Sequence, residues 1–176
     1  MSKNCKMIIA GFGGQGILFA GKVLAYAAML AQKHLSWLPS YGPEMRGGTA
    51  NCHVIISDEP VGSPIITEPD VLIAMNKPSL DKYEKDVEPG GKIYVNETLI
   101  DRKVQRQDVD VRYVDATGIA AKMGQNKLAN MVMVGGMLKE TGLFTLEQIK
   151  TAVNKCIKSM ELAEIDMQAI KAGYDC

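Results

Sequence analysis

The sequence is poor in the residues that build self-contained catalytic or metal centres. Its 176 residues include two histidines and four cysteines, and no two cysteines are spaced as a Cys-x-x-Cys pair. An iron–sulfur cluster or a zinc ion held by this chain alone is therefore not expected. The sequence also has no nucleophile elbow, no P-loop ending in Gly-Lys-Ser/Thr and no Gly-Asp-Gly of a thiamine diphosphate site. These absences predict a chain without a complete catalytic set of its own.

The sequence also lacks an excess of charge of either sign and a long uninterrupted apolar run. Lys+Arg and Asp+Glu both number 20, so there is no global basic field of the kind that favours nucleic-acid binding. The longest apolar stretch, 17–31, is interrupted by Lys22 and is too short to span a bilayer. No signal peptide is expected before the first apolar run, and the cysteines are expected to be reduced. The sequence therefore predicts a cytoplasmic protein that binds neither nucleic acid nor membrane.

The pattern of apolar segments predicts one α/β domain over residues 1–176. The length is that of a single domain, and short apolar runs bounded by glycine, proline and turn residues are typical of strands. Strands are expected at 6–10, 34–38, 49–57, 70–75, 92–95 and 109–114. Helices are expected at 17–31, 78–87, 127–139, from 145 onward and at 160–172. This alternation predicts a three-layer Rossmann-like domain with a mostly parallel sheet and a helical C-terminal region.

A glycine-rich segment follows the first predicted strand and opens the first predicted helix. It reads Gly-Phe-Gly-Gly-Gln-Gly at 11–16 and matches G-x-G-x-x-G in the context that the motif requires. Glycine lets the backbone approach an anion, and the helix N-terminus offers unpaired N–H groups to a phosphate or pyrophosphate. Alternatively, the glycines only allow close packing of helix on strand. The candidate binding residues are Gly11, Gly13, Gly14, Gln15 and Gly16.

The dinucleotide interpretation of this glycine loop fails one test. A site for NAD requires Asp or Glu about 20 residues further on to hold the ribose hydroxyls. No acidic residue occurs between Gly16 and Glu44, and Arg46 alone is a weak basis for an NADP site. The expected ligand therefore carries phosphate but is not NAD, and an NAD-dependent reductase is disfavoured.

A second loop, at 39–48, is rich in glycine and proline. If the first strand is central, this loop lies at the same carboxyl edge of the sheet as the glycine loop, where open α/β sheets bind ligands. Arg46 could pair with a phosphate or carboxylate, and Tyr41 could stack on a ligand. The alternative is an ordinary surface loop whose charged residues are solvated. The candidate binding residues here are Ser40, Tyr41, Glu44 and Arg46.

Three further features have both a structural and a functional interpretation. Asn76 follows the predicted strand 70–75 at the same edge, where a role in a turn is as reasonable as ligand binding. His53 lies within a predicted strand and is expected to be a satisfied side chain rather than a base. The helix 17–31 has no polar face, which indicates either a central core helix or a subunit interface.

Four segments in order carry a resemblance to a known family: Ile9–Gly16, Ser40–Cys52, Asp70–Lys82 and Asn130–Gly136. Together they resemble the gamma subunit of 2-oxoacid:ferredoxin oxidoreductases over nearly the whole chain. The run Ser-Tyr-Gly-Pro-Glu-Met-Arg-Gly-Gly is the most specific part, and it is closer to gamma subunits that act on 2-oxoglutarate or branched-chain oxoacids.

The resemblance implies a function that composition does not. Such enzymes oxidatively decarboxylate a 2-oxoacid, transfer the acyl group to coenzyme A and pass electrons to ferredoxin. It implies companion alpha, beta and delta (ferredoxin-like) subunits, with thiamine diphosphate and iron–sulfur clusters on these partners. In fused relatives the domain similar to this chain is associated with coenzyme A, whose pyrophosphate suits a glycine loop without a ribose-binding acid. The helices 17–31 and 127–139 then become candidate subunit interfaces, and this chain alone is expected to be inactive. The alternative is a stand-alone Rossmann-like nucleotide-binding module.

Overall fold

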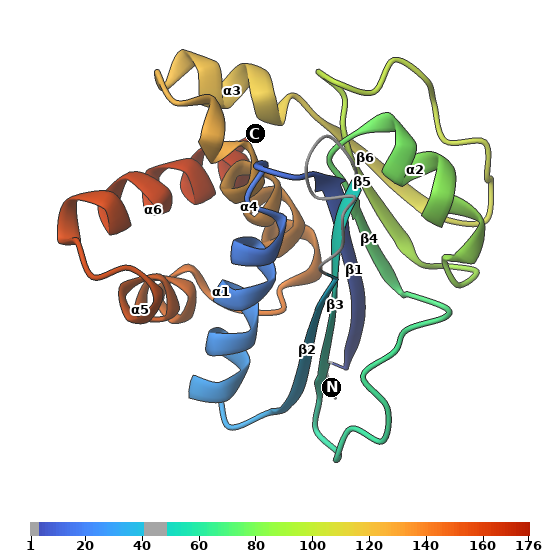
Figure 1. Cartoon of the computed structure of the whole chain (residues 1–176), viewed down its shortest axis with the longest axis horizontal. Coiled ribbons are helices and arrows are strands. Elements are labelled where there is room, and N and C mark those ends of the chain that lie inside the picture. Colours follow the sequence, from blue (N-terminus) through green and yellow to red (C-terminus); the bar gives the residue numbers. More distant parts are fainter. Residues whose placement is uncertain (1–3, 41–48) are drawn as a thin grey trace.

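The computed structural model describes residues 4–40 and 49–176 (Figure 1). Six strands form one sheet in this part of the chain: β1 (Cys5–Phe12), β2 (His34–Ser40), β3 (Thr49–Ser57), β4 (Val71–Ala74), β5 (Lys92–Asn96) and β6 (Asp110–Val114). The helices are α1 (Ile17–Leu30), α2 (Lys77–Tyr83), α3 (Ala116–Lys122), α4 (Ala129–Thr141), α5 (Leu146–Cys156) and α6 (Met160–Asp175). Two 3₁₀ turns, η2 (Glu84–Asp86) and η3 (Asn126–Leu128), follow α2 and precede α4.

The strand order in the sheet is β2-β3-β1-β4-β5-β6. β1, β4, β5 and β6 pair in parallel, whereas β3 is antiparallel to both of its neighbours, β1 and β2. The prediction of a mostly parallel sheet is confirmed. The reversed strand was not predicted. Once β3 pairs beside β2, the antiparallel direction is required, because the eight residues between Ser40 and Thr49 are fewer than a crossover to a parallel neighbour needs. The pairing itself is not visible in the sequence.

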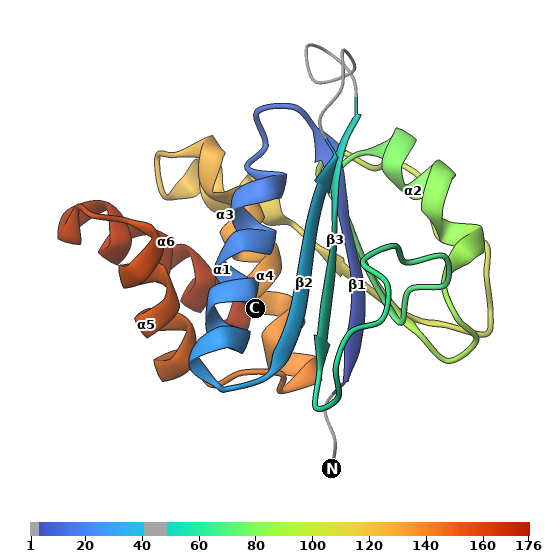
Figure 2. The ribbon, with the colours of Figure 1, turned by 60° about the horizontal axis from the view of Figure 1, so that its bottom comes forward.

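Both faces of the sheet are covered, so its central strands are apolar on both sides. In β1, Met7 and Ile9 face one core, while Ile8 and Ala10 face the other. This arrangement explains why the central strands have continuous apolar runs in the sequence. α1 and α4 lie on the first face, with α5 and α6 outside them, and α2 lies on the second face (Figure 2). The predicted three-layer α/β architecture is confirmed, with an added outer helical layer.

The helix α1 lacks a polar face because the chain itself covers it on two sides. β1, β2 and β3 contact one side of the helix and α5 contacts the other. The helix α4 is equally enclosed, since every residue from Ala129 to Leu138 is buried. Burial within the chain therefore accounts for the apolar composition of both helices. This supports the interpretation that they are core helices, and it weakens the interpretation that they are subunit interfaces.

The helices α4 and α6 are in backbone contact. A Cβ atom added at Gly135 would lie 1.9 Å from the carbonyl oxygen of Ile170, and one at Gly173 would lie 1.8 Å from the carbonyl oxygen of Val132. No side chain fits at distances this short. The two glycines therefore allow α6 to dock directly on α4.

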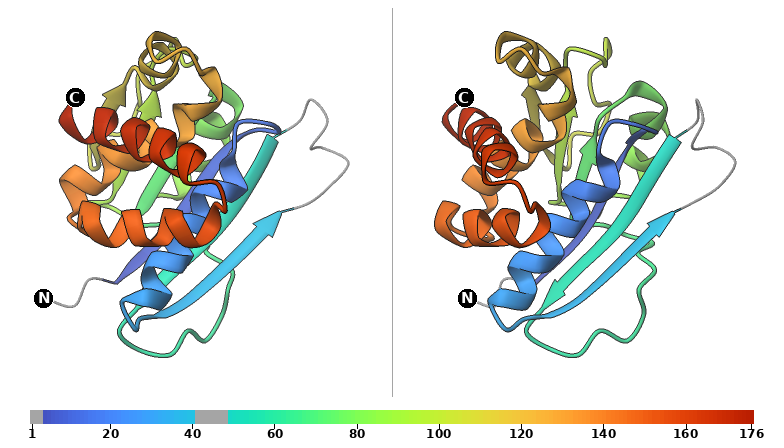
Figure 3. Two further views of the ribbon diagram at one scale, coloured as in Figure 1. Left: turned by 90° about the vertical axis from the view of Figure 1, so that its left-hand side faces the viewer. Right: turned by 60° about the vertical axis from the view of Figure 1, so that its left-hand side comes forward.

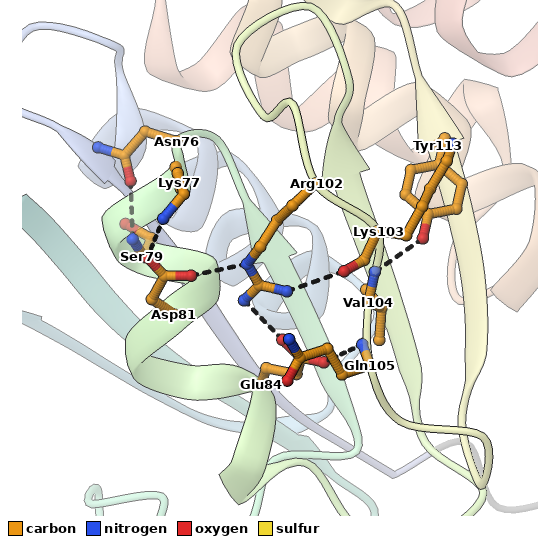
Figure 4. Close-up of polar contacts among 10 residues, drawn as sticks. All are labelled: Asn76, Lys77, Ser79, Asp81, Glu84, Arg102, Lys103, Val104, Gln105 and Tyr113. Carbon is orange, nitrogen blue, oxygen red and sulfur yellow. Dashed lines mark hydrogen bonds and ion pairs between the residues drawn. The ribbon is translucent and has the colours of Figure 1, made fainter.

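A network of charged groups ties the segment before β6 to α2 and η2 (Figure 4). The Arg102 guanidinium donates to Asp81 at 2.7 Å and to Glu84 at 2.6 Å. Glu84 is only 7% exposed, and it also accepts a hydrogen bond from the backbone N–H of Gln105. These groups line a cavity of about 500 Å³. Because its arginine and carboxylate groups pair with one another, we interpret the cluster as a structural clamp.

Replacing Arg102 with leucine is expected to lower the free energy of unfolding by about 2 kcal/mol. The variant leaves the buried Glu84 carboxylate without its cation, which is the costly way to break such a pair. The partial exposure of Arg102 reduces that cost. Urea unfolding of the purified chain measures the change. Lys77→Met is the matched control because Lys77 pairs with Asp81 on the exposed surface. We expect little change from the control, and losses of similar size in the two variants would contradict the interpretation.

Candidate functional site

The carboxyl edge of the sheet brings together polar residues from five strand ends. The glycine loop follows β1, and Asn76 and Asp115 follow β4 and β6. Asn96 ends β5 and Ser40 ends β2. Ser40 pairs with Asn51 on β3, and Asn51 also pairs with Ala10 on β1, so Ser40 lies at the edge that carries the glycine loop. This predicted neighbourhood is confirmed. Three other candidates lie outside the described residues: Tyr41, Glu44 and Arg46.

The glycine loop is shorter than its motif because β1 continues through Phe12. Gly11 lies in the strand, and a Cβ atom added there would come within 2.8 Å of the Met75 Cβ atom. For this residue the packing interpretation is correct. Gly14 and Gly16 instead have φ angles of 91° and 71°, which side chains disfavour, and a Cβ atom at Gly14 would meet nothing within 4 Å. Gly14 therefore presents open backbone at the exposed part of the loop.

Gln15 closes the loop rather than projecting from it. Its Oε1 atom accepts a hydrogen bond of 2.6 Å from the backbone N–H of Phe12. Its own backbone N–H donates to the carbonyl oxygen of Phe12 at 3.2 Å. The side-chain oxygen is thus used within the loop, and we assign Gln15 a structural role in shaping it.

Asn130 fastens the glycine loop to α4. Its Nδ2 atom donates to the carbonyl oxygen of Gly16 at 2.9 Å, and its Oδ1 atom accepts from the N–H of Met131 at 2.8 Å. Asn130 is 5% exposed, and a Cβ atom on Gly16 would lie 2.3 Å from its Nδ2 atom. Carbonyl and N–H groups of one peptide unit point in opposite directions. Asn130 therefore fixes the direction of the N–H of Ile17, the first residue of α1.

Within the described part of the chain, no side chain caps the N-terminus of α1. Gly16 occupies the N-cap position, and no acidic residue stands in the first turn. The first N–H groups of a helix carry a partial positive charge and need an acceptor. The open loop in front of them is thus suited to an anion.

A cavity of about 390 Å³ adjoins the glycine loop. Its lining comes from the glycine loop, from the segment around the start of α4 and from the first half of α6, and it includes Gly14, Gly16, Gln125, Lys127, Leu128, Asn130, Leu162, Ile165 and Asp166. Asp166 lines this cavity and has no hydrogen-bond or ion-pair partner among the described residues. Its partial burial raises the pKa of its carboxyl group to about 6. This carboxylate was not among the residues predicted from sequence.

Asn76 and His53 have structural roles. The Oδ1 atom of Asn76 accepts from the N–H of Ser79 at 2.9 Å and caps α2, while its Nδ2 atom is buried without a hydrogen-bond partner among the described residues. The Nδ1 atom of His53 accepts from the N–H of Ile66 at 3.0 Å, and burial lowers the pKa of the imidazole. The prediction that His53 is a satisfied side chain is confirmed. The role of Asn76 in the turn is also confirmed, whereas ligand binding by Asn76 stays a prediction.

Residues 4–40 and 49–176 contain neither a membrane-spanning helix nor a cluster of metal-ligating side chains. No helix there is long and apolar enough to cross a bilayer. No group of three or more His, Cys, Asp or Glu side chains there is arranged to hold a metal ion.

Comparison with known proteins places the chain in a family. A family model described as pyruvate ferredoxin/flavodoxin oxidoreductase matches residues 6–176. The chain belongs to this family. The ketoisovalerate oxidoreductase subunit VorA of Methanothermobacter marburgensis is 40% identical over 98% of the chain, which spans only 36% of that relative. The 2-oxoglutarate synthase subunit KorC of Methanocaldococcus jannaschii is 36% identical, and the match covers 95% of this chain and 90% of that subunit.

Two solved structures of oxoacid ferredoxin oxidoreductases share the fold. The gamma subunit of a keto/oxoacid ferredoxin oxidoreductase from Geobacter sulfurreducens matches with a TM-score of 0.83 and 29% identity, over 97% of this chain and 96% of its own. A 2-oxoglutarate:ferredoxin oxidoreductase from Magnetococcus marinus, solved with 2-oxoglutarate, coenzyme A and succinyl-CoA, matches with a TM-score of 0.85 and 21% identity. This second match covers 99% of the chain but 31% of that protein, and it shows the fold alone.

Proposed function

We propose that this chain is the gamma subunit of an enzyme that converts a 2-oxoacid to its acyl-CoA and CO₂ and reduces ferredoxin. The match to KorC over nearly its full length supports a gamma subunit and favours 2-oxoglutarate as the substrate. The match to VorA makes a branched-chain oxoacid the second choice. Companion alpha, beta and delta subunits would hold the thiamine diphosphate and the iron–sulfur clusters. They would complete the active site in the cytoplasm.

Within that enzyme the chain's proposed task is to hold coenzyme A. The observation that carries this proposal is the uncapped N-terminus of α1 behind the open backbone of Gly14. Backbone N–H groups at such a terminus are suited to the pyrophosphate of the coenzyme. The coenzyme supplies the thiol that accepts the acyl group. The Magnetococcus enzyme, which shares the fold of this chain, was solved with coenzyme A.

The chain's own residues would act by positioning. Gly14 and Gly16 supply backbone without side chains where the pyrophosphate approaches, and Asn130 orients the peptide between Gly16 and Ile17. Fixed donors of this kind need no reorganisation when the anion binds. A pyrophosphate held in place restricts where the thiol at the other end of the coenzyme can reach, which favours transfer over release.

Purification of the tagged chain from its host without oxygen tests the subunit assignment. A brown eluate that contains thiamine and larger partner subunits is expected, and a panel of oxoacids then identifies the substrate. A colourless chain without partners would overturn the proposal and favour a stand-alone nucleotide-binding module.

A charge placed in the glycine loop tests the proposed role in coenzyme A binding. Gly14→Asp in the assembled complex is expected to raise the KM for coenzyme A at least about tenfold, because a carboxylate would face the pyrophosphate. The kcat at saturating coenzyme is expected to change little. Gly14→Ala is the control, since it imposes the same backbone strain without a charge. An unchanged KM in Gly14→Asp, or an equal rise in both variants, would contradict the proposal.

A further inference from the structure

We propose that β2 is an interaction surface on which the same strand of a second copy of this chain pairs antiparallel, so that the sheet continues from one subunit into the next. The inference is independent of the proposed function, because it concerns the edge of the sheet and not the glycine loop. Among the described residues, β2 is the last strand on its side and β3 is its one hydrogen-bonded neighbour. Figure 3 shows β2, in light blue, at this rim of the sheet. Such an edge offers unpaired backbone groups to another strand.

The hydrogen bonds of the inner strands determine which backbone groups of β2 point outward. The carbonyl oxygen of Ala10 accepts from the N–H of Met75, just after β4, at 2.8 Å. Ala10 and every second residue of β1 therefore direct their backbone groups to β4, and the residues between them direct theirs to β3. The same alternation continues through the pairs that join β1 to β3 and β3 to β2. It turns the N–H and C=O groups of Leu35 and Trp37 away from β3, toward the open edge.

The position of Pro39 agrees with this assignment and sets the register of the proposed pair. Pro39 belongs to the same alternating set as Leu35 and Trp37, so its missing N–H falls on the open side. If Leu35 of each copy lies opposite Trp37 of the other, every outward N–H and C=O group of these two residues is paired.

The neighbouring registers are less favourable. A shift in one direction would place Pro39 opposite Leu35 and leave the Leu35 carbonyl oxygen without a donor. A shift in the other direction would bring in Lys33, whose N–H already donates to a carbonyl oxygen at the end of α1. The favoured register is therefore centred on Ser36, which faces Ser36 of the second copy.

The two edges of the sheet differ in the charges that protect an edge from pairing. β6, at the opposite edge, carries Asp110 and Arg112. β2 has no Lys, Arg, Asp or Glu, and its Leu38 is 38% exposed. Charged side chains on an edge strand oppose pairing with another chain. Because the net charge of the whole chain is zero, two copies also approach without mutual repulsion. β2 therefore fits an identical, uncharged strand.

The helix that covers this part of the sheet leaves room for the second copy. α1 packs over β1, β2 and β3 and so is centred near β3. In the continued sheet the two α1 helices would lie three strand spacings apart, about 14 Å, which exceeds a helix diameter of about 10 Å. Two antiparallel copies of one strand are related by a two-fold axis, so the contact closes after two copies.

Cysteine cross-linking of the purified full chain tests this register. The background is Cys176→Ser, which removes the exposed native thiol. In that background Ser36→Cys would place two thiols opposite each other at the two-fold axis, with Cα atoms about 4.5 Å apart, which is within reach of a disulfide. Under mild oxidation most of the chains are expected to become a covalent dimer on a non-reducing gel.

Leu38→Cys in the same background is the matched control, because Leu38 lies on the same face of β2 and is more exposed than Ser36. In the proposed register the two Leu38 residues are four positions apart along the strands, about 14 Å, which is beyond the reach of a disulfide. Random collision would instead favour the more exposed thiol. Cross-linking of Leu38→Cys that equals or exceeds that of Ser36→Cys would overturn the proposal.

Analytical ultracentrifugation of the chain without cysteine substitutions gives a second measurement. The wild type is expected to be a dimer, and Ser36→Lys is expected to raise the Kd of that dimer at least about tenfold, because two ammonium groups would meet at the axis. Gln168→Lys adds the same charge on the exposed surface of α6 and should leave the dimer intact. A monomeric wild type, or equal dimerisation of the two lysine variants, would contradict the proposed interface. Linkage of Ser36→Cys to a different protein in the assembled enzyme would assign the edge to that protein and also overturn the proposal.

Discussion

Replacing Gly135 with alanine is expected to lower the free energy of unfolding by about 3 kcal/mol or more. The added methyl group would lie 1.9 Å from the carbonyl oxygen of Ile170, so the backbones of α4 and α6 must move apart. Overpacking against a rigid backbone costs more than overpacking against a side chain that can rotate away. Urea unfolding followed by circular dichroism measures the loss.

The neighbouring glycine provides the control. A Cβ atom at Gly136 would have its nearest contact with Val114 at 3.5 Å, an ordinary van der Waals distance. Alanine is the better helix former by about 1 kcal/mol, so Gly136→Ala should be neutral or stabilising. If Gly135→Ala does not fold, the soluble yields of the two variants are compared instead. A lower yield for Gly135→Ala than for Gly136→Ala would support the prediction. Equal behaviour of the two variants would contradict the proposed backbone contact.

Replacing Asn130 with aspartate is expected to lower the free energy of unfolding by about 2 kcal/mol or more. The substitution puts a carboxylate oxygen where the Nδ2 atom donates to the Gly16 carbonyl oxygen, so an attraction becomes a repulsion inside the protein. In the assembled complex, the KM for coenzyme A should also rise while the kcat stays close to the wild-type value. This separation follows if Asn130 acts only by positioning the glycine loop.

Asn126→Asp is the appropriate comparison, because Asn126 is exposed and lies four residues earlier. Asn126→Asp adds the same charge near the start of α4, at a residue that does not line the cavity and makes no hydrogen bond to Gly16. A similar rise in KM in both variants would assign the effect to charge and not to position. Asn130→Ser offers a partial test of rescue, since a hydroxyl group can donate over a shorter reach.

The strands and helices could be predicted because local signals dominate them. The run 6–10 is apolar on both faces and is bounded by glycine, which limits it to a buried strand. Thr145 followed by Gln148 forms the capping box that starts α5. The direction of β3 could not be predicted, because the alternation in 49–57 shows which residues are buried but not which way the strand runs. That direction depends on pairing with β1, which is a tertiary property.

The candidate site was predictable only where a contiguous motif supplied it. The glycine loop is such a motif, although Gly11 and Gln15 proved to have packing and loop-closing roles. Asn130 and Asp166 lie on helices whose sequences follow ordinary burial patterns, and no spacing rule connects them to residues 11–16. Their positions come from the packing of α4 against α1 and of α6 against α4. Only the folded chain shows them.

The hydrogen bond between Gly16 and Asn130 joins residues 114 positions apart, which has a consequence for the order of events during synthesis. The first β-strand and the glycine loop leave the ribosome long before α4 and α6 exist. Closing so long a segment carries an entropic cost that only the late helices can offset. The loop should therefore reach its ligand-binding shape among the last events of folding. An incomplete chain would then be unable to sequester coenzyme, and a ligand that occupies the cavity would stabilise only molecules that are fully folded.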